Sequence, residues 1–238
     1  MIRFYFHPTP NPAKIALFLE ETGLAYEALP VDTSKGEQHA PAFRAINPNG
    51  KVPAIVDTEG PGGNEVRVFD STAILIYLAE KTGQLLGTSE DRPELLSWLL
   101  FIASGLGPFS GQAVHFQVSA PEGLDYAANR YRREAERHYQ VLNDHLSGRE
   151  FIVGSGFTIA DISAWGWLDR ASRVRKGAGV PLGPFPELWR WFAGVDARPA
   201  VCRAGGLAKS HAFKAINDEE TKRALFPSNY PPASAQGV

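Results

Sequence analysis

The chain has 238 residues, of which 44% are hydrophobic and 21% charged, the ordinary composition of a globular protein that buries a sizeable core. Its formal net charge of -2 gives no reason to expect nucleic acid or an anionic membrane as a partner. The single cysteine, Cys202, excludes an intramolecular disulfide and a cysteine zinc cluster, so a reducing cytoplasm is the expected location. The N-terminus lacks the apolar region of a signal peptide, and no apolar run approaches the roughly 18 residues that span a bilayer.

The first third of the chain alternates between strand and helix patterns. The expected elements are a strand over residues 2–6, a helix after the turn at 7–10, a strand over 26–31, a short helix around 41–45, strands over 52–57 and 65–69, and a helix over 71–81. Asn11 is the expected N-cap of the first long helix, and Pro12 is its expected first helical residue. The Gly/Pro-rich turn between the last two strands favours an antiparallel hairpin. This βαβ-α-ββα order predicts a thioredoxin-like α/β domain over residues 1–82.

Helical patterns dominate after a linker that we expect at residues 83–92. An all-α domain is predicted over 93–210, with helical segments over 93–104, 112–116, 126–146, 186–197 and 199–209 and another that begins at a capping arrangement formed by Thr158 and Asp161. Glycines and a proline between residues 105 and 111 are expected to separate the first two segments. Residues 211–238 are expected to form a partly disordered tail, because its end is rich in Pro, Ser, Ala and Gly.

Two motifs in the first domain describe a pocket for a small peptide that bears a carboxylate. A polar turn runs into an apolar strand through the Val52-Pro53 bond, where a cis peptide is allowed and proline supplies no ladder donor. The unpaired backbone at Val52 is a place where an extended peptide can add itself as a strand. Asp70 and Ser71 place an acid and a hydroxyl at the head of an apolar helix, where free N–H groups attract an anion.

The order and spacing of three motifs resemble those of the cytosolic glutathione transferases over roughly residues 1–210. These motifs are the Val52-Pro53 strand start, the Asp70-Ser71 helix head and the capping box in residues 157–161. Further segments resemble the Nu-class, Ure2-like branch of that family, namely Thr9-Pro10-Asn11, Lys14, residues 17–21, residues 47–51 and residues 105–108. Members of this branch reduce disulfides with glutathione, so the resemblance implies glutathione as a cosubstrate and no metal.

The resemblance implies a catalytic role for the turn after the first strand. In this branch the residues that match Thr9 and Asn11 lie at the glutathione sulfur, where each can donate a hydrogen bond. No cysteine occupies the turn, so the nucleophile would be the thiol of glutathione itself, its pKa lowered by these donors and by the helix N-terminus. A competing interpretation is that Thr9 and Asn11 are only turn and N-cap residues.

Seven further positions are expected to bind glutathione. The resemblance implies that the Val52 backbone, beside Pro53, pairs with the cysteinyl unit, and that Asp70 and Ser71 bind the γ-glutamyl end. It also implies that Gln38 and Lys51 lie near the glycyl end, and that Arg130 reaches glutathione across a dimer interface. Three alternatives stay open. In the first alternative Ser71 only caps its helix, in the second Lys51 is an ordinary solvated surface residue, and in the third Arg132 or Arg133 takes the role of Arg130.

We therefore expect a homodimeric cytoplasmic enzyme that reduces small disulfides by thiol–disulfide exchange with bound glutathione. One alternative is that the same thiolate attacks a carbon electrophile, in conjugation or in ether or thioether cleavage. A second alternative is a non-catalytic glutathione-binding protein, since fold does not fix function. Cys202 is expected to be inert. The second substrate is expected to lie beside Phe109, Gln112, His115 and Phe116, with the lone His115 more often structural than catalytic in such a place.

Overall fold

A four-stranded mixed sheet organises the N-terminal part of the chain in the computed structural model, which describes residues 1–215 and 218–230. The strands are β1 (Ile2–Phe6), β2 (Tyr26–Pro30), β3 (Ala54–Asp57) and β4 (Val66–Phe69). Their order in the sheet is β2-β1-β3-β4, with β1 parallel to β2 and antiparallel to β3, and with β3 antiparallel to β4. The parallel crossover and the hairpin confirm the predicted thioredoxin-like α/β fold.

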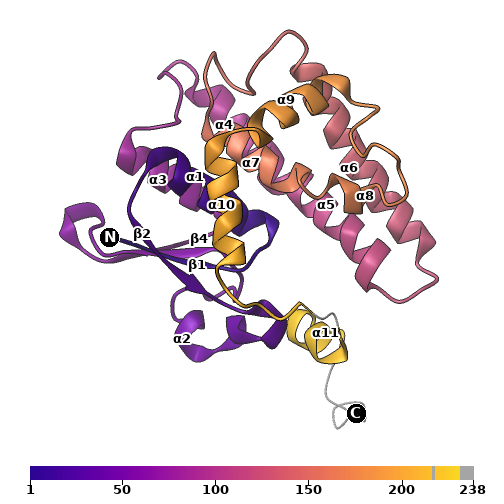
Figure 1. Ribbon diagram of the computed structural model, residues 1–238, viewed down its shortest axis with the longest axis horizontal. Helices are drawn as coiled ribbons and strands as arrows, with labels where there is room; N and C mark the ends of the chain where they lie inside the picture. The colour runs from indigo at the N-terminus through magenta and orange to yellow at the C-terminus, as the bar shows by residue number, and fades with distance from the viewer. Residues whose placement is uncertain (216–217, 231–238) are drawn as a thin grey trace.

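Three helices accompany this sheet. They are α1 (Pro10–Thr22), α2 (Pro41–Arg44) and α3 (Ser71–Thr82), with the short turns η1 (Thr33–Lys35), η2 (Glu37–His39) and η3 (Pro61–Gly63) between the elements. Figure 1 shows α1 and α3 on the side of the sheet that faces the helices of residues 92–196, and α2 on the other side. Because α1 is enclosed between the sheet and those helices, its Ile15, Leu17 and Phe18 side chains are fully buried.

The prediction that Asn11 caps α1 is wrong. Thr9 is the N-cap, in an extended conformation with φ -129° and ψ 164°, and the helix begins at Pro10. Pro10 already has the φ that a first helical residue needs and has no N–H to leave unpaired, so the helix starts two residues earlier than Pro12. The side chain of Asn11 is therefore available for contacts outside its own helix.

The C-terminal part is all helical, as predicted. Its elements are α4 (Arg92–Phe101), η4 (Ile102–Leu106), α5 (Gly107–Val114), η5 (His115–Ser119), α6 (Asp125–His145), α7 (Ile159–Leu168), α8 (Ala171–Val174), α9 (Pro186–Asp196) and α10 (Pro199–Lys209). One hydrophobic cluster continues from the sheet and α1 into these helices, so the two parts share a core. Within the described residues, no helix is long and apolar enough to cross a membrane.

The glycines between residues 105 and 111 do not separate two helices, contrary to the prediction. Helical structure is continuous from Arg92 to Ser119, with two π-helical turns, η4 and η5, inserted in it. Glycine at these positions instead permits close packing. A Cβ on Gly107 would lie 2.6 Å from the Trp167 indole nitrogen, and a Cβ on Gly105 would collide with the ring of His138.

The predicted capping box at the start of α7 is confirmed. The Thr158 hydroxyl accepts a hydrogen bond from Ala160 N, and Asp161 accepts one from Thr158 N at 2.9 Å. Asp161 is completely buried, and it also accepts from Ile152 N and from the Trp191 indole at 2.8 Å. Burial raises the pKa of Asp161, while these donors act in the opposite direction. The cap therefore ties α7 to the preceding loop and to α9.

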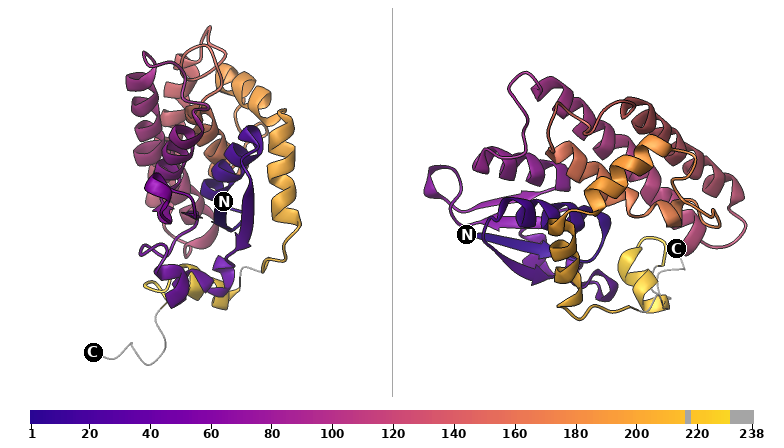
Figure 2. Two further views of the ribbon diagram at one scale, coloured as in Figure 1. Left: turned by 90° about the vertical axis from the view of Figure 1, so that its left-hand side faces the viewer. Right: turned by 45° about the horizontal axis from the view of Figure 1, so that its top comes forward.

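The last described segment returns to the N-terminal domain. After α10, which packs along α1, the chain crosses to α11 (Glu219–Leu225), and this helix lies against η1 and beside η2 (Figures 1 and 2). Lys214 N donates to the buried Asp32 carboxylate at 2.8 Å, and Gln38 Nε2 donates to Ala224 O at 3.0 Å. Residues 211–230 thus contain an ordered helix, whereas the prediction for 216–217 and 231–238 falls outside the described residues.

Candidate functional site

A cavity of about 430 Å³ lies where the first turns of α1 and α3 meet α5 and α7. Four of the predicted site residues line it, namely Asn11, Lys51, Asp70 and Ser71. These residues are up to 60 positions apart in the chain, and the crossover and hairpin of the sheet bring them together. The opposite wall comes from the helical domain, through Gln112 of α5 and Trp167 of α7 among others.

The first turn of α3 is capped by the carboxylate of Asp70. Asp70 is the N-cap, and its Oδ1 accepts from Thr72 N at 2.8 Å and from Ala73 N at 3.3 Å. The backbone of Asp70 has φ 71°, which is uncommon for a residue with a side chain and is typical of functional sites. Because Asp70 supplies the cap, the alternative that Ser71 is only a helix cap is wrong.

Ser71 connects the two helix heads instead. Its hydroxyl donates to Asn11 Oδ1 at 3.3 Å, and it is only 6% exposed. Since Ser71 engages the oxygen of the Asn11 amide, the amide nitrogen is the group of Asn11 that can donate into the cavity. This contact gives Asn11 a position in the cavity wall that is independent of helix capping.

Lys14 is a site residue whose role the sequence analysis did not assign. Its side chain is 1% exposed, with Nζ 3.5 Å from Ser71 Oγ and 5.7 Å from the centroid of the Trp167 ring. Burial lowers the pKa of Lys14 to about 7, while the charge of Asp70 acts in the opposite direction. Helical spacing was the available signal, since Lys14 shares a face of α1 with the buried Leu17 and Phe18.

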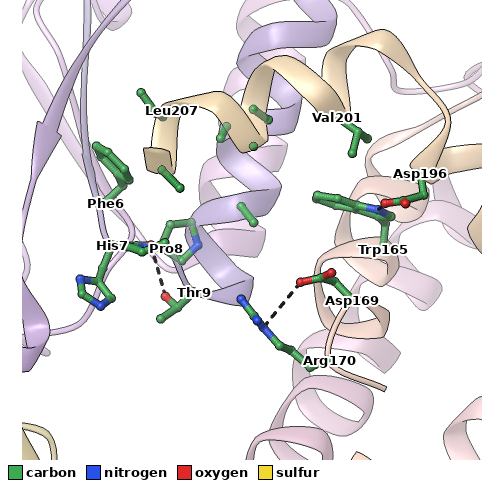
Figure 3. Close-up of a pocket in the computed structure, with 16 residues that line it drawn as sticks. Phe6, His7, Pro8, Thr9, Trp165, Asp169, Arg170, Asp196, Val201 and Leu207 are labelled. Atoms are coloured by element: carbon green, nitrogen blue, oxygen red, sulfur yellow. Dashed lines mark hydrogen bonds and ion pairs between the residues drawn. The ribbon is translucent and has the colours of Figure 1, made fainter. Parts of the chain in front are cut away.

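Thr9 lies on a different cavity from Asn11. This second cavity, of about 260 Å³, separates the turn after β1 from α7 and α10 (Figure 3). Thr9 Oγ1 donates to His7 O at 3.5 Å, and across the cavity Arg170 pairs with Asp169. The structure therefore brings Asn11 together with Asp70 and Ser71, but places Thr9 on the other side of the same turn.

The segment before β3 contains the predicted Val52 and Pro53. The Val52-Pro53 bond is cis, and β3 begins only at Ala54, two residues later than predicted. Asn47 Nδ2 donates to Lys51 O at 2.5 Å, which fixes the turn that carries Lys51 to the cavity. The half-buried Val52 thus lies between this turn and the strand.

Gln38 and Arg130 lie away from the lining of this cavity. Gln38 is 3% exposed and holds α11 through Ala224 O, while its backbone oxygen lies 3.3 Å from the position of a Cβ on Gly50. Arg130 projects from α6 with a side chain 57% exposed, and it pairs with Glu134 at 3.2 Å. Within one chain, neither residue therefore lines the cavity that contains Asn11 and Ser71.

A further cavity adjoins the first along α5. Gly111 and Gln112 line both this cavity and the one that contains Asn11 and Ser71. His115 and Phe116 extend the further cavity, which has a volume of about 570 Å³. Phe226, which follows α11, closes this cavity with its ring 4.7 Å from that of His115. Burial lowers the pKa of His115, so its ring is neutral at pH 7. The predicted Phe109 packs instead against Tyr131 and His138.

No metal centre is formed by the described residues. In 1–215 and 218–230 there is no group of three or more His, Cys, Asp or Glu side chains placed to hold an ion. Cys202 is exposed on α10 and lines none of the cavities described above. The arrangement at the cavity therefore offers hydrogen-bond donors, a carboxylate and two lysines to a ligand.

Comparison with known proteins gives a consistent assignment. Residues 1–80 match the glutathione S-transferase N-terminal domain, and residues 125–194 match the glutathione S-transferase C-terminal domain. A curated relative, the disulfide-bond oxidoreductase YfcG of Escherichia coli, is 43% identical over 206 residues, which are 86% of this chain and 94% of the relative.

Solved structures show the same likeness. A glutathione transferase family member from Pseudomonas fluorescens, solved with two glutathione bound, has a TM-score of 0.82 at 43% identity and covers 85% of this chain and 91% of its own. A glutathione transferase from Pseudomonas putida, solved with one glutathione disulfide per subunit, has a TM-score of 0.82 at 39% identity, with 85% and 90% covered.

Proposed function

The chain belongs to the glutathione S-transferase family, in its Nu-class, Ure2-like branch, and from this premise we propose that it reduces small disulfides with bound glutathione. The observation that carries the proposal is the convergence of Asn11, Asp70 and Ser71 on one cavity. The relative named as a disulfide-bond oxidoreductase and the neighbours solved with glutathione or its disulfide support it.

In the proposed complex, glutathione lies across the cavity as an extended peptide. The Asp70 carboxylate binds the α-ammonium of the γ-glutamyl end, and the α-carboxylate accepts from the backbone N–H of Ser71, beside the Ser71 hydroxyl. The Val52 backbone pairs with the cysteinyl unit in the manner of an added strand. Lys51 reaches the glycyl carboxylate, and Gln38, whose backbone oxygen lies beside Gly50, supports this end.

The proposed reaction uses two glutathione molecules. The first, as a thiolate, attacks one sulfur of the substrate disulfide, so that one S–S bond breaks, a mixed disulfide forms and one substrate thiolate leaves. The second glutathione thiolate attacks the glutathione sulfur of the mixed disulfide, releasing the other substrate thiolate and oxidised glutathione. The two thiol protons of glutathione end on the two product thiols, and its two electrons reduce the substrate.

The protein contributes position and charge to this exchange. The amide nitrogen of Asn11 donates to the sulfur of the first glutathione, and the N-terminus of α1 adds a positive dipole end. Thr9 is the N-cap of α1 in the same turn, and it lines the neighbouring cavity. The cavity formed with His115, Phe116 and Phe226 receives the substrate disulfide.

The proposal includes a homodimer and a cytoplasmic location. The exposed position of Arg130 on α6 supports the dimer, because a second copy could bring this guanidinium to glutathione where its own chain does not. A reducing compartment is consistent with a reaction that consumes reduced glutathione and with a single free cysteine.

The test compares two substrates with the purified protein. We expect glutathione-dependent turnover of 2-hydroxyethyl disulfide, followed by coupled glutathione reductase, to exceed conjugation of an aryl halide. Efficient conjugation without disulfide turnover would replace the proposal with carbon-electrophile chemistry. Retention on immobilised glutathione without turnover of either substrate would show a binding protein.

A further inference from the structure

We propose that Lys14 is the buried cationic partner of the α-carboxylate of the bound ligand, beneath Ser71, and that it selects thiols with a free γ-glutamyl terminus. This inference rests on the proposed binding of glutathione and assigns the recognition of its γ-glutamyl end. Lys14 lines the cavity with its Nζ 3.5 Å from Ser71 Oγ, the hydroxyl beside which the proposed complex places that carboxylate.

The surroundings of Lys14 favour a ligand that brings a negative charge. Nζ faces Ser71 and Asp70 at the head of α3 and the ring of Trp167 from α7, and the exposed Lys51 is the second lysine of the cavity lining. The charge of Asp70 favours the ammonium of Lys14, but its Oδ1 is engaged by the Thr72 and Ala73 N–H groups of α3. Within the described part of the chain, Lys14 forms no ion pair within 4.0 Å.

The packing around Lys14 shows that this position is built for a long side chain. A Cβ on Gly166 would lie 2.6 Å from Lys14 Cγ, so α7 passes the stem of the lysine at a distance that only glycine permits. The amine therefore has a fixed path from α1 to the cavity, although 99% of the side chain is removed from water. An apolar residue would fill this path at a lower desolvation cost, so the charge points to a ligand.

Binding is then coupled to protonation. The amine of the ligand-free protein is largely neutral above pH 7, because burial lowers its pKa. A carboxylate beside Ser71 favours the ammonium, so the ligand and a proton bind together. A thiol without the α-carboxylate, such as cysteinylglycine, leaves Lys14 neutral and forfeits this contact.

The experiment measures proton uptake by calorimetry at pH 8 in buffers of different ionisation enthalpy. The ligand is S-methylglutathione, which has no thiol proton to release. We expect the wild-type protein to take up most of one proton for each site filled. Lys14→Met should lose this uptake and bind about 10-fold or more weakly, whereas Lys176→Met, the loss of an exposed lysine that does not line this cavity, should keep both the uptake and the affinity.

A second ligand tests the proposal on the unaltered protein. The analogue of S-methylglutathione with 4-aminobutyrate in place of the γ-glutamyl unit lacks only the α-carboxylate, and we expect it to bind without proton uptake. Equal uptake with both ligands, or uptake retained in Lys14→Met, would overturn the role of Lys14 while leaving the proposed function intact. Failure of S-methylglutathione to bind would overturn both. Binding with uptake but without disulfide turnover would overturn only the proposed reaction.

Discussion

Asn11 is held in the cavity wall by the Ser71 hydroxyl and not by a capping role in its own helix. If its amide nitrogen donates to the glutathione sulfur, Asn11→Ala removes one preorganised donor and should lower kcat/KM for 2-hydroxyethyl disulfide by roughly 100-fold. Thr9→Val, which removes the hydroxyl on the other face of the turn, is the control and should change kcat/KM less than about 3-fold. Steady-state kinetics with both variants distinguish the two residues. A larger loss in Thr9→Val would place the sulfur at the cavity shown in Figure 3.

Lys14 gives the protein a pH-dependent stability whose sign can be worked out. The folded pKa of about 7 lies below the unfolded value of 10.5, so between these values the unfolded chain binds more protons and stability rises with pH. Below pH 7 the full desolvation cost is present. Lys14→Met should therefore be more stable than wild type by a few kcal/mol at pH 6.5, since each pKa unit is worth about 1.4 kcal/mol.

The pH dependence of the difference is the decisive measurement for Lys14. Urea unfolding at pH 6.5, 8 and 9.5 should show the advantage of Lys14→Met shrinking as the pH rises, because any change in packing against Trp167 is independent of pH. An advantage that stayed constant over this range would mean that burial does not lower the pKa of Lys14.

At the scale of elements, the α4–α5 helix owes its approach to α7 to Gly107. Gly107→Ala places a Cβ 2.6 Å from the Trp167 indole nitrogen and should destabilise the protein by about 1–3 kcal/mol. Gly111→Ala is the matched control, because its Cβ would meet Trp167 at an ordinary 3.4 Å and alanine favours a helix by about 1 kcal/mol. Denaturant unfolding should show a lower free energy of unfolding for Gly107→Ala and a higher one for Gly111→Ala. Equal changes in the two variants would mean that the indole contact is not the cause.

The same helix shows what the sequence could and could not predict. Local patterns were sufficient for the strands, for the capping box at Thr158 and for most helices, because each depends on residues near one another in the chain. They failed at Gly107, where the reason for glycine lies in Trp167, 60 residues away. They also failed at Lys14, because nothing local shows that α3 and α7 will bury its amine.

The candidate site was predictable to a similar extent. Asp70 and Ser71 form a helix head that local chemistry describes, and the structure brings them to Asn11. The separation of Thr9 from Asn11 was not predictable, since it depends on α1 starting at Pro10 and thereby turning two side chains that are two residues apart to different faces. Which of two adjacent cavities a side chain enters is decided by packing against distant helices.

At the scale of the whole molecule, the C-terminal segment returns over the N-terminal domain and completes a cavity that α5 begins. Asp32 and Gln38 anchor this return through Lys214 N and Ala224 O, and it places the ring of Phe226 opposite His115. The wall beside the proposed disulfide site thus comes from residues more than 100 positions apart in the chain. The glutathione-facing cavity, in contrast, contains no residue of this segment.

Phe226 should therefore affect the disulfide without affecting glutathione. Phe226→Ala removes an aromatic wall and should raise the KM for an aromatic disulfide by about 10-fold, since burying such a ring is worth roughly 1.5–3 kcal/mol. The dissociation constant of S-methylglutathione should stay unchanged, because Phe226 does not line that cavity. Trp189→Ala, the loss of an exposed aromatic on α9, should leave both constants unchanged. If Phe226→Ala weakened glutathione and disulfide alike, the two cavities would act as one site, and the division of labour along α5 would be lost.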